Sequence, residues 1–114
     1  MTLHYFPLYV RVEAVRMLLH YKNVEFTDNV ISFADWGAAK PGFPNGQVPC
    51  LELGDGTKLG QSLAILRLLG KQHGMYPADA MAAYHVDSLI DEFNDTLGKI
   101  YKPAFFKPSE DVAE

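Results

Sequence analysis

The sequence is poor in cysteine: Cys50 is the single one among 114 residues. One thiol excludes an internal disulfide and any metal site built from several cysteines. The four histidines have no metal-ligand spacing, and the glycines form no phosphate-binding loop pattern. The sequence therefore predicts neither a metal site nor a resident cofactor.

Long apolar runs and an excess of basic charge are also missing. No apolar run approaches the roughly 20 residues of a membrane-spanning helix, and the N-terminus lacks the pattern of a signal peptide. Ten Lys and Arg residues stand against fourteen Asp and Glu residues, a formal net charge of −4. This balance disfavours nucleic acid or an anionic membrane as the main partner. We expect a cytoplasmic, reduced protein.

Residues 1–76 show the periodicities of an α/β domain. Short runs rich in β-formers alternate with stretches in which apolar residues recur at helical spacing. Gly54-Asp55-Gly56 is a hairpin signal between two short strands. The order βαβ–ββα predicts a parallel pair, an antiparallel hairpin and hence a mixed four-stranded sheet with helices on its faces. The expected strands cover residues 3–6, 24–31, 48–53 and 57–59, and the expected helices cover residues 11–22 and 62–73.

Residues 79–114 form a second predicted domain, which contains one long amphipathic helix. The helix is expected to begin near Asp79, and Pro103 and Pro108 are expected to end or kink it. One helix cannot bury its apolar stripe alone, so it needs the first domain, another subunit or further helices. The stripe consists of Val86, Leu89, Ile90, Phe93, Leu97, Ile100 and Tyr101.

Four motifs occur in order along the chain: YFPLYVR at 5–11, AVRMLL at 14–19, GQVP at 46–49 and QSLAILR at 61–67. Together they resemble the cytosolic glutathione transferases, most closely the tyrosine-type pi and sigma classes. The resemblance implies a thioredoxin-like N-terminal domain, followed here by the start of a truncated all-α domain. It also implies glutathione transferase activity.

Tyr5 is the candidate catalytic residue. It ends the first strand, and ligands of open α/β sheets bind at the carboxyl ends of strands. The resemblance implies that its hydroxyl donates a hydrogen bond to the sulfur of glutathione and so favours the thiolate. The alternative for Tyr5 is an aromatic residue packed in the core.

The resemblance assigns further residues to the glycine end and the middle of glutathione. Arg11 is assigned to the neighbourhood of the glycine end, and Trp36 and Lys40 to the glycine carboxylate, which suits both donors. Gln47-Val48-Pro49 is assigned to the cysteine residue, with a cis Pro49 and with Val48 pairing through its backbone. The alternatives are a solvated arginine, a tryptophan packed on the loop and a proline that opens a strand.

Gln61 and Ser62 are assigned to the γ-glutamyl carboxylate. Ser62 is a candidate N-cap of the third helix, and the N-terminus of a helix favours an anion. Simple capping is the alternative for Ser62, and the two roles are compatible.

The resemblance also implies a homodimer. Asp95 matches an aspartate that reaches the γ-glutamyl ammonium across the dimer, and Asp87 matches an acidic position near the dimer axis, where it can meet Arg67 of the other subunit. Asp87, Asp91 and Asp95 repeat every four residues, so a solvated acidic face is the alternative. We assign Arg67, Asp87 and Asp91 to the interface.

Besides the truncation, the sequence departs from the family pattern in two places. Tyr9 and Val10 replace an Arg-Gly pair, and we expect Tyr9 to line the electrophile pocket. Asn45 stands where an aromatic residue locks the dimer in related classes, which predicts a more polar or weaker interface. The first strand-to-helix turn has no cysteine, and this excludes chemistry of the thioredoxin type.

The predicted function is conjugation of the glutathione thiolate to small hydrophobic electrophiles, as in detoxification. Glutathione is then a substrate. Two alternatives remain: a non-catalytic module for dimerisation or structure, and a glutathione-dependent isomerase or peroxidase that uses the same site.

Overall fold

A computed structural model describes residues 1–105, with side chains to residue 100. The chain divides into two compact units, Met1–Tyr76 and Pro77–Glu114. Each unit is described by itself, and the division into a glutathione-binding domain at 1–76 and the start of a helical domain at 79–114 stays a prediction.

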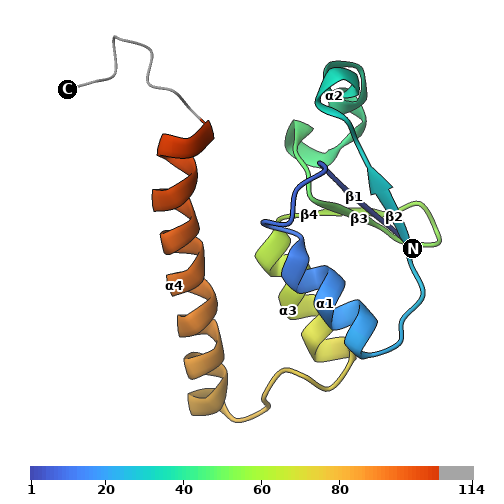
Figure 1. Ribbon diagram of the computed structural model, residues 1–114. Helices are drawn as coiled ribbons and strands as arrows, with labels where there is room; N and C mark the ends of the chain where they lie inside the picture. The colour runs from blue at the N-terminus through green and yellow to red at the C-terminus, as the bar shows by residue number, and fades with distance from the viewer. Residues whose placement is uncertain (106–114) are drawn as a thin grey trace. The chain divides into compact units, whose positions relative to one another are not determined.

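The first unit is built on the predicted mixed sheet. Its strands are β1 (Thr2–Tyr5), β2 (Thr27–Val30), β3 (Cys50–Glu52) and β4 (Lys58–Gly60), in the order β2-β1-β3-β4. β1 and β2 are parallel, whereas β3 is antiparallel to both β1 and β4. The thioredoxin-like βαβ–ββα arrangement is therefore confirmed (Figure 1).

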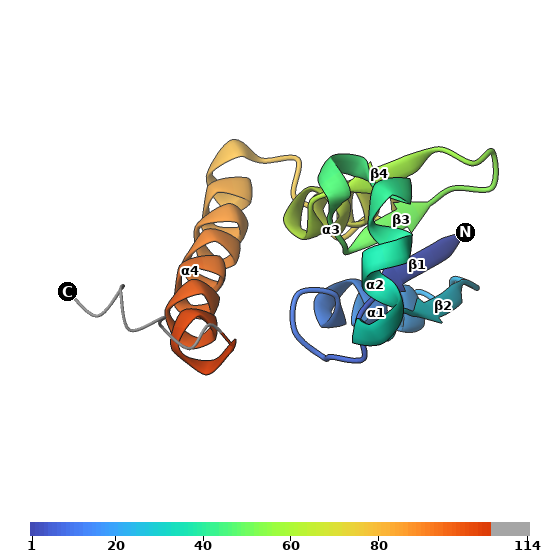
Figure 2. The ribbon, with the colours of Figure 1, turned by 90° about the horizontal axis from the view of Figure 1, so that it is seen from above.

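Helices cover both faces of this sheet. α1 (Glu13–Tyr21) and α3 (Ser62–Gln72) pack side by side on one face, and the short α2 (Phe33–Ala39) lies on the other (Figures 1 and 2). Two 3-10 turns, Lys40–Gly42 and Pro44–Gly46, lead from α2 toward β3. The core between the sheet and the α1–α3 pair consists of Leu3, Tyr5, Val12, Val15, Leu18, Leu19, Leu51, Ile65 and Leu69.

Alternation along β1 separates the two faces. Leu3 and Tyr5 belong to the core on the α1–α3 side, and successive side chains of a strand point to opposite faces. His4 therefore faces the α2 side, where its ring meets the edge of Phe43 with 5.1 Å between ring centroids.

β2 begins three residues later than the sequence predicts. The N–H of Val24 donates to the carbonyl of Leu19 at the end of α1 (2.9 Å), so this residue completes the helix terminus and cannot join the ladder. Phe26 packs against the core before the strand begins.

α2 has an N-cap that the spacing of apolar residues does not predict. The hydroxyl of Ser32 accepts from the N–H of Asp35 (3.2 Å) and donates to its carboxylate (2.7 Å). The Ser-x-x-Asp spacing is that of a capping box and is the signal that could have found this cap, although the carboxylate accepts here from the Ser32 hydroxyl.

The second unit is described as one helix, α4 (Ala80–Phe105). Asp79 caps it, as its carboxylate accepts from the N–H of Ala82 (2.9 Å), which agrees with the predicted start. The helix continues through Pro103, so that proline does not end it; only two helical residues follow Pro103, so its missing N–H affects the last turn alone. Pro108 lies outside the described residues. Within residues 1–105, no helix combines the length and apolar character needed to cross a membrane.

Candidate functional site

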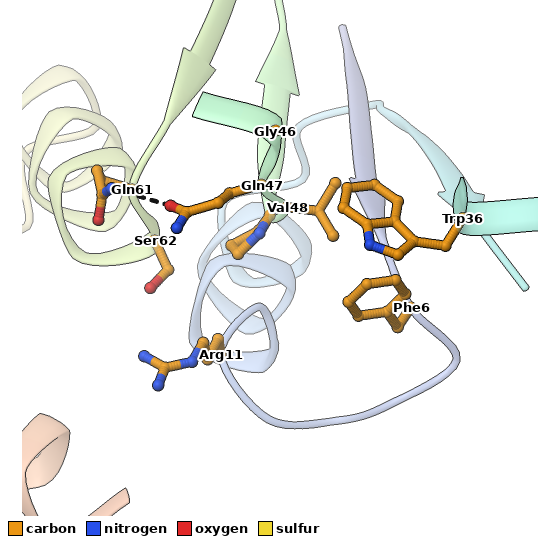
Figure 3. Close-up of a pocket in the computed structure, with 9 residues that line it drawn as sticks. Phe6, Arg11, Trp36, Gly46, Gln47, Val48, Gln61 and Ser62 are labelled. Atoms are coloured by element: carbon orange, nitrogen blue, oxygen red, sulfur yellow. Dashed lines mark hydrogen bonds between the residues drawn. The ribbon is translucent and has the colours of Figure 1, made fainter. Parts of the chain in front are cut away.

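A cavity of about 530 Å³ opens where four segments of the first unit converge (Figure 3). The segments are the loop after β1, α2, the stretch before β3 and the start of α3. Distant parts of the sequence therefore share one pocket of a size suited to a small molecule. The described residues that line it are Phe6, Arg11, Trp36, Gly46, Gln47, Val48, Pro49, Gln61 and Ser62.

One side of the cavity is aromatic. Trp36 meets Phe6 edge-on, with 5.1 Å between ring centroids and 83° between planes. Phe33, one turn earlier in α2, stacks on the same Phe6 at 5.0 Å. Trp36 is thereby held with its indole beside Val48 at the wall of the pocket (Figure 3).

The other side is polar. Arg11, Gln61 and Ser62 lie there, with Gln47 between them and the rings (Figure 3). The amide of Gln61 donates to that of Gln47 over 3.5 Å, a long hydrogen bond. Among the described lining residues there is one cation, Arg11, and no carboxylate, so the electrostatics of the pocket favour an anionic ligand.

The start of α3 corrects one prediction. Ser62 is the first helical residue and not the N-cap; the N-cap position belongs to Gln61, at φ 70° and ψ 103°. The carbonyl of Gln61 accepts the first helical hydrogen bond, from the N–H of Ile65 (3.0 Å). Glutamine in this left-handed region is strained, and propensity rules would not place it there.

The segment before β3 bears out one structural expectation. The peptide bond Val48–Pro49 is cis, as the resemblance implied. Val48 precedes the first ladder residue, Cys50, so its backbone groups lie outside the pairing of β3 with β1 and β4.

Three predicted residues of the first unit are missing from the described lining of the cavity. Tyr5 is 4% exposed and belongs to the core, next to Phe6 at 5.6 Å between ring centroids. Lys40 runs alongside the lining residue Gly46, because a Cβ there would be 3.1 Å from Lys40 Cε. Tyr9 is 82% exposed and lines a separate hollow together with Leu8.

Phe6 and Gly46 line the cavity but were not predicted as site residues. Phe6 directly follows Tyr5, and Gly46 belongs to the Gly-Gln-Val-Pro motif, so both stand next to residues that the sequence did single out. Gly46 has φ +60°, a conformation that favours glycine.

The predicted interface residues divide between the two units. Arg67 is half-buried on α3, and Asp87, Asp91 and Asp95 follow one another on α4, the last two exposed. The roles of these four residues stay predictions, as do the ligand contacts assigned to the residues of the cavity.

Cys50 faces the α2 side of the sheet, opposite His4 in the ladder. Burial raises the pKa of its thiol, and the nearby positive charge of Lys58 offsets only part of this effect. A buried neutral thiol is a poor nucleophile. In the described part of the chain, no group of three His, Cys, Asp or Glu residues could hold a metal ion.

Fold and pocket together define a thioredoxin-like domain with a cavity of small-molecule size at the strand ends. A family model described as "Glutathione S-transferase, N-terminal domain" matches residues 11–72, more than half of the chain. The chain therefore belongs to the glutathione S-transferase family.

Individual relatives agree with this assignment. Glutathione S-transferase 1 of Ascaris suum is 41% identical over 90% of this chain and 49% of the relative. Hematopoietic prostaglandin D synthase of Homo sapiens is 38% identical over 83% of this chain and 47% of the relative. The solved structure of prostaglandin synthase D of Nilaparvata lugens superposes with a TM-score of 0.85 at 38% identity, covering 93% of this chain and 54% of that one. The chain thus spans about half the length of the relatives it matches.

Proposed function

We propose that this chain provides the glutathione site of a glutathione transferase, which conjugates the glutathione thiolate to small hydrophobic electrophiles. The observation that carries the proposal is the convergence of Arg11, Trp36, Gln47–Pro49 and Gln61–Ser62 on one cavity. Glutathione enters as a substrate, and the proposed setting is detoxification in the cytoplasm.

Each end of glutathione finds suitable groups. The Trp36 indole N–H and the cation of Lys40 are donors for the glycine carboxylate. Arg11 is also assigned near the glycine end, and its cation lies on the polar side of the cavity with Gln61 and Ser62. The first turn of α3, at Gln61 and Ser62, offers backbone N–H groups without intrahelical acceptors to the γ-glutamyl carboxylate. The backbone of Val48 can pair with the cysteine residue as an added strand would.

Tyr5 is the proposed catalytic residue. A free thiol has a pKa near 8.5, so a hydrogen bond from the tyrosine hydroxyl to sulfur is needed to favour the thiolate at neutral pH. The thiolate then forms the bond to the electrophilic carbon, and the leaving group departs with its electron pair. Tyr5 is packed in the core next to Phe6, which lines the cavity, and this neighbourhood supports the assignment.

A homodimer is part of the proposal. Asp95 of a second copy would meet the γ-glutamyl ammonium, and Asp87 and Asp91 would lie near the axis, close to Arg67. Exposed apolar residues of α4, including Leu89 and Phe93, support association, because a stripe of this kind is normally covered.

A titration of Trp36 fluorescence with glutathione tests the binding site. Trp36 is the single tryptophan, so we expect a saturable change in its emission, which competing S-hexylglutathione should abolish. No change at millimolar ligand, in a chain whose circular dichroism shows it to be folded, would contradict the proposal.

Tyr5→Phe tests the chemistry. We expect a loss of conjugating activity of about 100-fold, the lower end of what a positioned proton donor contributes, with the Kd for glutathione kept. Tyr21→Phe is the matched control, because Tyr21 is exposed on α1. If the wild-type chain binds glutathione but shows no conjugating activity, it is a non-catalytic module.

A glutathione-dependent isomerase is the second candidate. The likeness to two prostaglandin D synthases, at 38% identity each, favours it. Formation of prostaglandin D from an isomeric precursor, dependent on both glutathione and Tyr5, would identify this activity; conjugation without it would support the transferase.

A further inference from the structure

α2 carries Trp36 but is not anchored by a core of its own. None of its residues, Phe33–Ala39, is buried. Trp36 instead has two ring neighbours, Phe6 on one side and Phe43 on the other. Phe43 lies nearly parallel to the indole, with 5.8 Å between centroids and 29° between planes. The position of Trp36 therefore depends on what holds Phe43.

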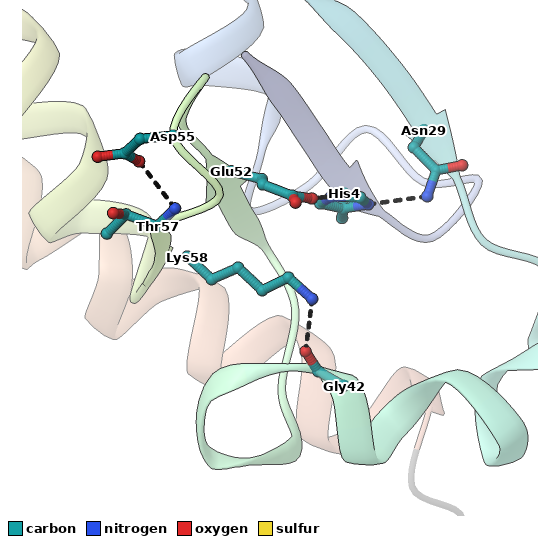
Figure 4. A network of polar contacts seen from close by, with 7 residues as sticks. All are labelled: His4, Asn29, Gly42, Glu52, Asp55, Thr57 and Lys58. Atoms are coloured by element: carbon teal, nitrogen blue, oxygen red, sulfur yellow. Dashed lines mark hydrogen bonds and ion pairs between the residues drawn. The ribbon is translucent and has the colours of Figure 1, made fainter.

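Lys58 of β4 holds Phe43 and the backbone next to it. Its ammonium lies 5.2 Å from the centroid of the Phe43 ring and donates to the carbonyl of Gly42 (2.8 Å) (Figure 4). One side chain thus fixes two consecutive residues of the segment that leads from α2 to the cavity. A cation over an aromatic face and a charged hydrogen bond are both attractive.

His4 supports Phe43 from the sheet. Its Nε2–H donates to Glu52 on β3 (2.8 Å), and its Nδ1 accepts from the amide of Asn29 on β2 (2.8 Å) (Figure 4). The imidazole is therefore fixed across three neighbouring strands, and its ring meets Phe43 at 5.1 Å. The polar face of the sheet in this way provides a rigid base for the Phe43 ring.

We infer that Lys58 and Phe43 are positioning residues for the ligand site: they hold Trp36 at the wall of the cavity before any ligand arrives. The inference rests on the proposed function in so far as the ligand is glutathione. Without Lys58, the segment from α2 to the cavity loses the hydrogen bond at Gly42 and the cation–π contact at Phe43 that join it to β4, and ligand binding must order the indole. This ordering cost appears as a weaker Kd.

Lys58→Met tests the inference, and Lys71→Met is its matched control. Lys71 lies near the C-terminal end of α3, away from the cavity, with its ammonium 4.9 Å from the ring of Tyr76. Two readouts from Trp36 are compared: acrylamide quenching of the ligand-free protein and the Kd for glutathione. Urea midpoints of both variants show how much stability each has lost.

Lys58→Met should raise the quenching constant and raise Kd by about 3- to 10-fold, as expected for an exposed cation–π contact and one charged hydrogen bond. Lys58→Arg should restore both, since a guanidinium can donate and also stack on the ring. Lys71→Met should change neither. If Lys58→Met fails to fold, Lys58→Gln provides the same comparison.

Equal quenching in Lys58→Met, Lys71→Met and the wild type would overturn the inference, whether or not the protein binds glutathione. Raised quenching in Lys58→Met with an unchanged Kd for glutathione would show that Lys58 positions Trp36 but has no role in ligand binding, and would overturn that part of the inference. Absence of glutathione binding in the wild type would refute the proposed function, and the ligand-free quenching would still decide whether Lys58 positions Trp36.

Discussion

The ion pair between Arg16 and Asp28 gives the sharpest prediction about stability. Arg16 Nε lies 2.9 Å from Asp28 Oδ2, and its NH2 group donates to Oδ1 over 3.1 Å. The same guanidinium donates to the carbonyl of Leu8 (3.2 Å) and meets Glu13 at 3.4 Å. One side chain thus joins α1, the loop after β1 and the edge strand β2.

Asp28→Asn keeps the size of the side chain and removes the charge. The Arg16 side chain is 11% exposed and that of Asp28 is 38% exposed, so the cation stays nearly buried with its best partner neutralised. Removal of one partner from a fully buried pair costs about 3–5 kcal/mol, whereas an exposed pair contributes about 0–1 kcal/mol. The partial exposure of Asp28 places the expected loss at about 1–2 kcal/mol.

Urea unfolding followed by far-ultraviolet circular dichroism measures this loss, with Glu13→Gln as the control. Glu13 makes a single contact at 3.4 Å and is 37% exposed, so we expect a loss below about 0.5 kcal/mol. For a domain of this size, the Asp28→Asn loss corresponds to a melting temperature lower by roughly 4–16 °C. Equal losses in the two variants would refute the argument from geometry and burial.

Two further predictions concern Gly46 and Cys50. Gly46→Ala should lower stability by about 1–2 kcal/mol, the cost of a left-handed backbone for a residue with a Cβ, and should weaken glutathione binding; a Cβ there also lies 3.1 Å from Lys40 Cε. Gly54→Ala, with open space around its Cβ, is the control for both readouts. Burial raises the pKa of Cys50, so the native state holds its proton longer than the unfolded chain does. Its contribution to stability is then complete below pH about 9, the ordinary thiol value, and is lost as the pH rises further. Urea midpoints between pH 8 and 10.5 should fall more steeply for the wild type than for Cys50→Ala; parallel curves would contradict this.

The elements with a buried stripe could be predicted from the sequence. Val15, Leu18 and Leu19 on α1 are buried, as are Ile65 and Leu69 on α3, and helical spacing alone assigned these residues to their helices. The hairpin between β3 and β4 followed from its turn residues, which act locally. These signals are short-range, so a single sequence contains them.

The boundaries and the strained positions could not be predicted in this way. β2 begins late because the N–H of Val24 bonds to the end of α1. The two elements compete for this residue, and the sequence of either element alone does not show the outcome. Gln61 takes the N-cap position at positive φ although Ser62 is the better capping residue. The surrounding structure determines these boundaries and backbone conformations, so local propensity does not predict them.

The pocket also combines predictable and unpredictable features. Its residues could be predicted to lie together only through the family resemblance, because Arg11, Trp36, Val48 and Gln61 have no common periodicity. The contact of His4 with Phe43 was missed altogether. It depends on which face of β1 receives the segment after α2, and that is a property of the packed domain.

The two faces of the sheet have different roles: one contains the core that stabilises the domain, and the other carries the residues that position Trp36. Tyr5 points into the core with Leu3, so the proposed hydrogen-bond donor is fixed by the same packing that holds the domain together. Trp36 belongs to a helix without a buried residue and contacts Phe6 and Phe43; Lys58 in turn contacts the Phe43 ring. Substitutions that loosen the core should therefore lower both the free energy of unfolding and the conjugating activity, because the position of Tyr5 depends on that packing. Substitutions at Lys58 or Phe43 should change ligand affinity with a smaller loss of stability, because few apolar contacts of the core depend on them.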